Sequence, residues 1–267
     1  MAIIYVSVAG VGFRVHERQR TRYGGFWREF GSGRFEPATV AALRSRLGPG
    51  TTFFDGGAWI GPFTLLAAAL GARVVAVEAD PLAVNELRAN LALNPELAGR
   101  VSLLPVAIAT RDGRVRLDGG RVGLGNGLTR LAAIPKAEPS ATETDRGTVQ
   151  AVDVRTLGLE QFTLVKLDIE GGEFAVVVRL NPSAGLRRAP LLLSLHGPDP
   201  AGCSVLRSWW LRLSAAPRQL RLAWALRGYA NVYRILSNRS SETTKLRPIA
   251  RFALGLRLGE TELLLTD

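Results

Sequence analysis

Two short segments of the chain carry residue types that can bind a cofactor and do chemistry. The first is DGGAWIG at residues 55–61, where an acid and three glycines follow an apolar run and precede a helical pattern. The second is KLDIEGGE at residues 166–173, where three acids close another apolar run. Open α/β sheets bind ligands at the carboxyl ends of their strands. Both segments are therefore expected to lie at one ligand-binding edge.

The loop at residues 55–61 predicts a cofactor of the nucleotide type. Glycines let a ligand approach the backbone, and Glu78 ends the next apolar run 21 residues after Gly57. A carboxylate at that point can accept hydrogen bonds from both ribose hydroxyls. This pair fits a dinucleotide or S-adenosylmethionine (SAM). A strand–turn–helix that uses glycines only for tight turning is the plainer alternative.

The acid that opens the loop favours SAM over a dinucleotide. A G-x-G-x-x-G loop would need glycine at position 58, which is Ala58, and Asp55 beside a pyrophosphate would be unfavourable. The D-x-G-x-G-x-G loops of methyltransferases match at Asp55, Gly57 and Gly61, with Trp59 in place of the middle glycine. We expect SAM to contact these residues: Asp55, Gly57, Ala58, Gly61, Glu78, Ala79 and Ala107.

The second segment predicts the chemical half of the site. Asp168 is a charge at the end of an apolar strand, where an unpaired charge is rarely buried. Glu170 and Glu173 fit the same site, but each can instead stabilise the N-terminus of the following helix. His196 ends the next apolar run, and its unperturbed pKa near 6.5 suits a general base. A structural histidine at a strand end is the alternative. The expected catalytic residues are Asp168, Glu170 and His196.

The elements around these segments predict an α/β fold. From residue 51 to 109 the pattern reads strand, helix, strand, helix, strand, with VSLLPVAIA as the third strand. This alternation indicates a doubly wound, mostly parallel sheet. Residues 3–30 read as three short strands, IIYVSV, GFRVHE and GFWREF. Residues 1–50 are expected to pack on a domain formed by residues 51–267, as a single domain overall.

Two later segments interrupt or extend this pattern. Residues 118–150 break the alternation and read as an inserted loop, which we expect to form or gate the acceptor pocket; a disordered insertion without a role is the alternative. Strands are expected again at TLVKLDIEGG, PLLLSLHGP, GYANVYRIL and TELLLTD, and helix at EFAVVVRL and residues 201–226.

The motifs resemble those of the FkbM family of SAM-dependent methyltransferases. That family shows a loop like D-x-G-A-N-x-G, a strand ending in a Glu–Pro-type turn and a K-x-D-x-E-G-x-E segment. Here these read DGGAWIG, VEADP and KLDIEGGE, and lesser features fit at GRFEP (33–37), PVAIATRDGRVRL (105–117) and GYANVYRI (228–235). The departures are Trp59, where the family usually has Asn, and Ser194, where members often carry Glu.

The resemblance implies a Rossmann-like class I methyltransferase sheet and transfer of the SAM methyl group to a hydroxyl. The acceptor would be a small molecule, a sugar, or a glycolipid or natural product. No residue is assigned to a metal, although a carboxylate-plus-histidine set could hold one Mg²⁺ or Mn²⁺.

Composition excludes several other classes. Hydrophobic residues make up 47% and charged residues 21%, which excludes a mostly disordered or collagenous chain. Cys203 is the one cysteine, so the chain has no intrachain disulfide and no cysteine-built metal site. His16 and His196 are the two histidines, too few for a zinc site with several His ligands. No apolar run is long enough for a transmembrane helix. We expect a cytoplasmic protein.

The net charge of +11 lies mostly in the last third of the chain. Residues 186–267 carry 13 basic and 5 acidic side chains. Tryptophan, leucine and arginine alternate in residues 201–227, so this segment could touch an anionic membrane surface or cover the sheet with its apolar face. No RNA-binding motif supports a nucleic-acid partner.

Two alternatives of other classes remain. An NAD-linked oxidoreductase or epimerase would use the same fold, but Asp55, Ala58 and KLDIEGGE argue against it, and no Tyr-x-x-x-Lys pair occurs. A non-catalytic module would bind an anionic polymer or membrane through residues 186–259.

Overall fold

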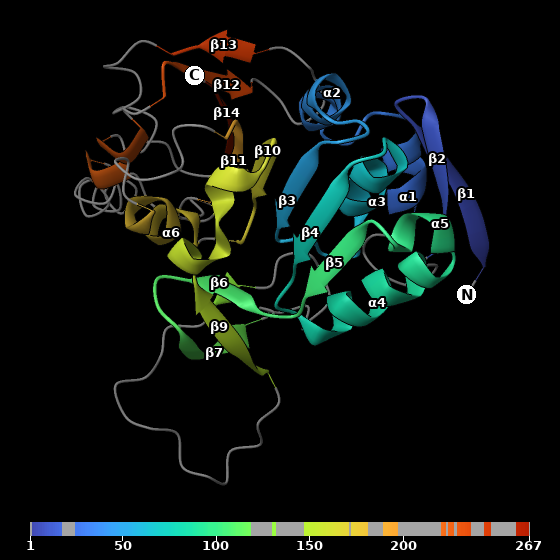
Figure 1. Cartoon of the computed structure of the whole chain (residues 1–267), viewed down its shortest axis with the longest axis horizontal. Coiled ribbons are helices and arrows are strands. Elements are labelled where there is room, and N and C mark those ends of the chain that lie inside the picture. The colour runs from blue at the N-terminus through green and yellow to red at the C-terminus, as the bar shows by residue number, and fades with distance from the viewer. Residues whose placement is uncertain are drawn as a thin grey trace, which may run out of the picture.

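A mostly parallel sheet of eight strands forms the centre of the computed structural model (Figure 1). The structure describes residues 2–17, 25–118, 130–131, 147–170, 172–180, 189–196, 220–222, 224–226, 229–235, 243–246 and 260–266. The strand order is β13-β12-β14-β11-β10-β3-β4-β5. The bounds are β3 Thr52–Gly56, β4 Arg73–Val77, β5 Val101–Leu104, β10 Leu164–Leu167, β11 Leu191–His196, β12 Asn231–Ile235, β13 Thr243–Lys245 and β14 Glu260–Thr266.

The direction of the strands brings the two sequence motifs to one edge. Strands β5, β4, β3, β10 and β11 are mutually parallel, whereas β14 runs antiparallel to β11 and to β12. The chain leaves β3 in the middle of the sheet, crosses to β4 and β5 on one side and then returns to β10 and β11 on the other. The strand order therefore reverses between β3 and β10, which is where doubly wound folds bind ligands.

Helices cover both faces of this sheet, as a doubly wound fold requires. Phe53, Leu164 and Leu192 face a core shared with α3, whereas Phe54 and Val165 face a second core that includes α6. Alternate residues of one strand enter opposite cores because side chains in a strand point to opposite faces. The helices are α2 Pro37–Arg46, α3 Pro62–Ala69, α4 Pro81–Ala92, α5 Pro95–Ala98 and α6 Glu173–Arg179.

The N-terminal elements pack on the first core, and one of them differs from the prediction. β1 (Ile3–Val8) and β2 (Val11–His16) form an antiparallel hairpin beside α3 and α4 (Figure 1). GFWREF was expected to be a strand but is helix α1, Phe26–Gly31. Its apolar residues Phe26, Trp27 and Phe30 lie on one helical face and are buried together, so tertiary packing decides the element.

The third predicted strand of the main sheet is two strands in different sheets. β5 ends at Leu104 and β6 (Ala107–Ala109) begins after Pro105, whose ring cannot donate a ladder hydrogen bond. β6 belongs to a four-stranded sheet of order β6-β9-β7-β8, with β7 Gly113–Asp118, β8 Arg130–Leu131 and β9 Thr148–Asp153. The segment expected as an irregular insertion therefore begins and ends in strands, and two short 3₁₀ turns at Val154–Leu157 and Leu159–Gln161 lead to β10.

The last third of the chain is described in part. Residues 220–222 and 224–226 are helical; Leu222 and Leu226 are buried, while Leu220 and Trp224 are more than half exposed. Residues 201–219, and with them most of the segment expected to contact a membrane, lie outside the described residues. Among the described residues, no helix has the length and apolar character needed to span a bilayer.

Candidate functional site

The glycine loop after β3 brings its backbone into direct contact with the end of β10. Gly57 has a φ of 82°, and a Cβ added there would lie 1.8 Å from the carbonyl oxygen of Asp168. The amides of Gly57 and Ala58 both donate to the carbonyl of Val77. Only glycine combines this conformation with this approach. The predicted cofactor loop and the predicted acidic segment are therefore adjacent in space.

The contacts of Trp59 explain how this loop accommodates an aromatic residue. Its φ is 49°, a left-handed conformation that is unusual for a bulky residue. Its ring packs edge-to-face on Phe26 of α1 at 4.8 Å, and its amide donates to Glu78 at 2.7 Å. Helix α1 therefore stabilises the loop on one side and Glu78 on the other.

Glu78 follows β4 and uses both carboxylate oxygens to shape this loop. One oxygen accepts the amide of Trp59, and the other accepts the amide of Asp80 at 2.8 Å. Burial raises the pKa of Glu78 to about 7, against the opposing effect of these amides. Each carboxylate oxygen can accept a second hydrogen bond, so ribose binding stays compatible with these contacts.

Asp55 is buried at the end of β3 with one oxygen unused. Thr64 donates to Asp55 Oδ2, whereas Oδ1 has no hydrogen-bond partner. Burial raises the pKa of Asp55, and nearby Lys166 opposes the shift.

A lysine on β10 neutralises part of the buried charge. Lys166 is 3% exposed, and its Nζ donates to Asp168 Oδ2 at 2.7 Å while lying over the Phe63 ring. Burial opposes the lysine charge, but the carboxylates of Asp168, Glu36 and Asp55 outweigh it, so the pKa of Lys166 is above its ordinary range. Burial also opposes the charge of Asp168, yet Lys166 and His196 hold its pKa below the usual range.

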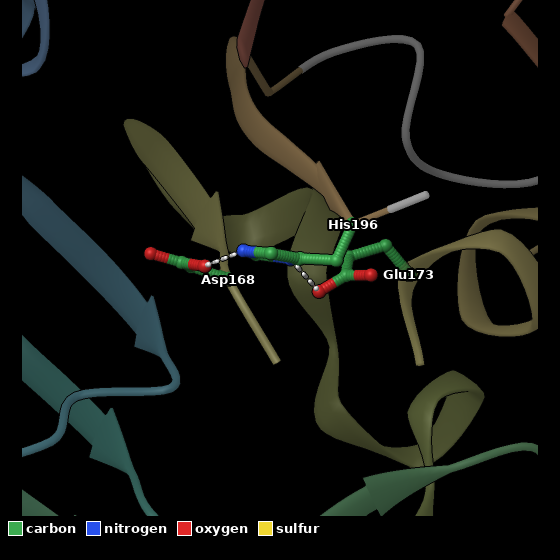
Figure 2. Close-up of side chains that lie close together, drawn as sticks. All are labelled: Asp168, Glu173 and His196. Atoms are coloured by element: carbon green, nitrogen blue, oxygen red, sulfur yellow. Dashed lines mark hydrogen bonds and ion pairs between the residues drawn. The ribbon is translucent and has the colours of Figure 1, made fainter. Parts of the chain in front are cut away.

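Three carboxylates surround the imidazole of His196. Figure 2 shows its ring between Asp168 and Glu173. Nδ1 lies 3.1 Å from Glu173 Oε1, while Nε2 lies 3.7 Å from Asp168 Oδ1 and 3.6 Å from Glu170 Oε1. Glu173 is fully buried and also accepts the amide of Ile169 at 2.9 Å. Glu173 therefore fixes the ring and turns its other nitrogen toward two carboxylates.

This environment changes the protonation state expected of His196. Burial disfavours the charged ring, but the hydrogen bond to Glu173 and the carboxylates of Asp168 and Glu170 prevail and raise the pKa of His196 to about 9. This value lies well above the unperturbed pKa of histidine, near 6.5. At neutral pH the ring already carries its proton, so it has to lose that proton before it can serve as a base.

Two further buried acids lie outside the predicted set. Glu36, the residue before α2, is buried with Oε2 unpartnered, and burial raises its pKa to about 8, with Lys166 opposing and Asp168 adding to the rise. Glu262 on β14 is buried opposite Ser194 of β11. Directly paired strand residues point to one face, so the Glu262 carboxylate lies on the same face of the sheet as Ser194.

The predicted residues fall into two groups in the structure. The expected cofactor residues at the ends of β3 and β4 are Asp55, Gly57, Ala58, Gly61, Glu78 and Ala79. The expected catalytic residues at the ends of β10 and β11 are Asp168, Glu170 and His196. Ala107 is buried on β6. Lys166 was not expected in the second group, and Glu173 was weighed for the site or for a helix terminus but was not among the expected catalytic residues, although both belong to KLDIEGGE. Glu36 belongs to GRFEP, another segment that resembles the FkbM family. The proposed lid, residues 118–150, lies largely outside the described residues.

The sheet order and the glycine loop define the Rossmann-like α/β fold of class I methyltransferases. The methyltransferase FkbM domain matches residues 55–203, more than half of the chain. The chain therefore belongs to the FkbM methyltransferase family, as its motifs indicated. No curated protein matches the chain.

Similar solved structures are remote. An FkbM methyltransferase from Methylobacillus flagellatus is 14% identical with a TM-score of 0.43, over 80% of this chain and 43% of that one. Pyrococcus horikoshii TYW2, solved with MeSAdo, is 13% identical with a TM-score of 0.44, over 98% of this chain and 69% of that one. The Pyrococcus abyssi tRNA (uracil-54, C5)-methyltransferase is 12% identical with a TM-score of 0.43, over 99% and 43%. This chain therefore spans less than half of the FkbM structure.

Proposed function

We propose that the protein transfers the methyl group of SAM to a hydroxyl oxygen of a small molecule, a sugar, or a glycolipid or natural product. The contact between Gly57 and Asp168 carries this proposal, because a cofactor on the glycine loop would present its methyl group beside the carboxylates of β10. A hydroxyl is a poor nucleophile, and groups that accept its proton accelerate its reaction.

The residues around Asp168 can supply that assistance. The hydroxyl proton passes to a carboxylate of the group as the oxygen attacks the methyl carbon. The electron pair of the breaking C–S bond stays on sulfur, which leaves S-adenosylhomocysteine. His196, charged below a pKa of about 9, holds the carboxylates in place and accepts a proton only above that value.

The acids at the ends of β3 and β4 favour SAM over NAD in this site. Asp55 Oδ1 is buried and unpartnered, and Glu78 is available to a ribose. A carboxylate with an unused oxygen suits a cofactor that carries an ammonium and a sulfonium, whereas it repels a pyrophosphate. An NAD-linked reaction would have to place the pyrophosphate at this point.

Two measurements test the proposal. Calorimetry should show binding of SAM and S-adenosylhomocysteine and none of NAD⁺. Incubation with methyl-labelled SAM and a panel of sugars, glycolipids and polyhydroxylated natural products should then yield a methyl ether, which mass spectrometry and NMR locate on oxygen. Binding of NAD⁺ in preference to SAM, or a product methylated on nitrogen or carbon, would overturn it.

A further inference from the structure

We propose that Asp168, Glu170 and His196 bind a divalent metal ion, with Glu173 orienting the histidine ring. The site goes beyond the proposed methyl transfer, because metal binding itself does not depend on SAM or on the acceptor. It uses a histidine nitrogen and two carboxylate oxygens that three different parts of the chain bring together: the end of β10, the turn before α6 and the end of β11.

The spacing of the imidazole nitrogen from each of two carboxylates is close to that of ligands sharing one cation. His196 Nε2 is 3.7 Å from Asp168 Oδ1 and 3.6 Å from Glu170 Oε1, which is too long for good hydrogen bonds. Two ligands of one ion at about 2.1 Å lie about 3.0–3.4 Å apart for right-angled to tetrahedral geometry. Small rotations of Asp168 and Glu170 would bring each carboxylate to that spacing from Nε2.

The other nitrogen of the ring has the partner that a metal-bound histidine requires. Nδ1 lies 3.1 Å from Glu173 Oε1, and Glu173 is fully buried and also accepts the Ile169 amide. Histidine ligands almost always donate their second N–H to a carboxylate or a carbonyl, which fixes the tautomer and the ring. Glu173 is thus a positioning residue, and Nε2 is the nitrogen directed at Asp168 and Glu170.

The charges of the group suit a metal ion in place of a ring proton. Three carboxylates share His196, and Lys166 pairs with one of them, Asp168. A metal ion at Nε2 would take the place of the proton there and keep a positive charge beside Asp168 and Glu170.

The ligand set indicates the kind of ion and its use. Two carboxylates suit Mn²⁺ or Mg²⁺, and an imidazole is accepted more readily by Mn²⁺ than by Mg²⁺, which prefers oxygen. Three protein ligands leave positions for oxygens of the acceptor. An ion there would lower the pKa of a bound hydroxyl, so that a weakly basic carboxylate would suffice to take its proton. This catalytic role rests on the proposed function.

Metal binding is tested first without any turnover. The full chain is stripped with EDTA, exchanged into clean buffer and titrated with Mn²⁺, while electron paramagnetic resonance measures the free ion. We expect one Mn²⁺ per chain, competed by Mg²⁺. His196→Ala and Asp168→Asn should each weaken binding by about 100-fold or more, and Glu173→Gln by about 10–100-fold.

Matched controls separate ligation from folding. His16→Gln removes the other histidine, and Glu160→Gln removes an exposed carboxylate; both should bind Mn²⁺ as the parent does. Circular dichroism checks each variant, and Glu170→Gln replaces any ligand variant that does not fold. No saturable Mn²⁺ binding by the parent, or equal binding by the parent and the folded ligand variants, overturns the site.

Calorimetry with S-adenosylhomocysteine on the stripped protein separates this inference from the proposed function. Binding of S-adenosylhomocysteine without Mn²⁺ binding overturns the metal site and leaves methyl transfer standing. Binding of Mn²⁺ without S-adenosylhomocysteine supports the metal site and overturns the proposed function. Methyl transfer that EDTA abolishes and Mn²⁺ restores supports the catalytic role, and transfer that EDTA leaves unchanged overturns that role.

Discussion

The ends of β3 and β4 and the ends of β10 and β11 build their parts of the site in different ways. At β3 and β4 the backbone dominates: Gly57 allows the loop to touch Asp168, and Glu78 accepts two amides. At β10 and β11 charged side chains dominate: His196 lies among three carboxylates, and Lys166 pairs with one of them.

This difference between backbone and charged side chains corresponds to two tasks expected of the site, cofactor binding and proton transfer. A cofactor of fixed structure can be held by a loop of fixed shape, and loop shape depends on glycine and on backbone hydrogen bonds. Proton transfer and charge stabilisation need groups whose charge state is set by their neighbours. Substitutions at the two ends should therefore have different consequences: loss of cofactor affinity at β3 and β4, and loss of turnover at β10 and β11.

The largest effect is expected from removing the charge of Asp168. Asp168→Asn keeps the shape of the side chain but takes away one carboxylate of the group and the ion-pair partner of Lys166. We expect turnover of an accepted hydroxyl substrate to fall about 10²–10⁴-fold. Affinity for S-adenosylhomocysteine should stay within a few fold, measured by calorimetry. Equal losses of affinity and turnover would show that the two ends act as one unit.

A methyl group at Gly57 should disrupt the part of the site at the ends of β3 and β4. Gly57→Ala places its Cβ 1.8 Å from the Asp168 carbonyl oxygen, at a φ of 82°. Gly50→Ala is the matched control, because Gly50 has a φ of 84° and open space around its Cβ position. The left-handed backbone alone costs about 1–2 kcal/mol, so Gly57→Ala should lose more than Gly50→Ala.

The Gly57 comparison is read by urea unfolding and by calorimetry with S-adenosylhomocysteine. Gly57→Ala alone should also lose cofactor binding. If the two variants lose equal stability and both bind the cofactor, the loop tolerates a side chain and its close approach to β10 does not matter for the site.

Glu78 tests whether loop shape and cofactor contact share one carboxylate. Glu78→Gln removes an acceptor of charged hydrogen bonds, each worth about 1.5–3 kcal/mol, so cofactor affinity should fall about 10–100-fold. Glu96→Gln, an exposed acid on α5, is the control and should bind normally. Unchanged affinity in Glu78→Gln would remove this residue from the cofactor site.

The smallest expected effect is a pH dependence of stability from His196. Its pKa is raised from 6.5 to about 9, so its contribution is fully present below pH 6.5 and is lost as pH rises through about 9. In EDTA, the parent should lose about 1–3 kcal/mol relative to His196→Gln across this range. Urea unfolding at several pH values measures the difference. A constant difference would show that the ring is not held as a cation.

Local sequence determined the parts of this protein that depend on neighbouring residues. The alternating apolar runs of residues 51–109 and 164–196 specify parallel strands and crossovers, because buried strands and helices need such patterns. The loop at Asp55 and the segment at Asp168 are contiguous motifs, so the FkbM family and the edge of the sheet that carries the site could be predicted. The single-domain division and the roles of individual site residues stay predictions.

Tertiary structure decided the rest. GFWREF is a helix because its aromatic side chains pack on the first core, and Pro105 ends β5 so that Ala107 begins a strand of another sheet. The protonation of His196 could not be read from its strand, because the acids that raise its pKa approach from β10 and α6. Glu262 likewise meets Ser194 only through strand pairing. Contacts between residues far apart in the chain set these features, and no local pattern encodes them.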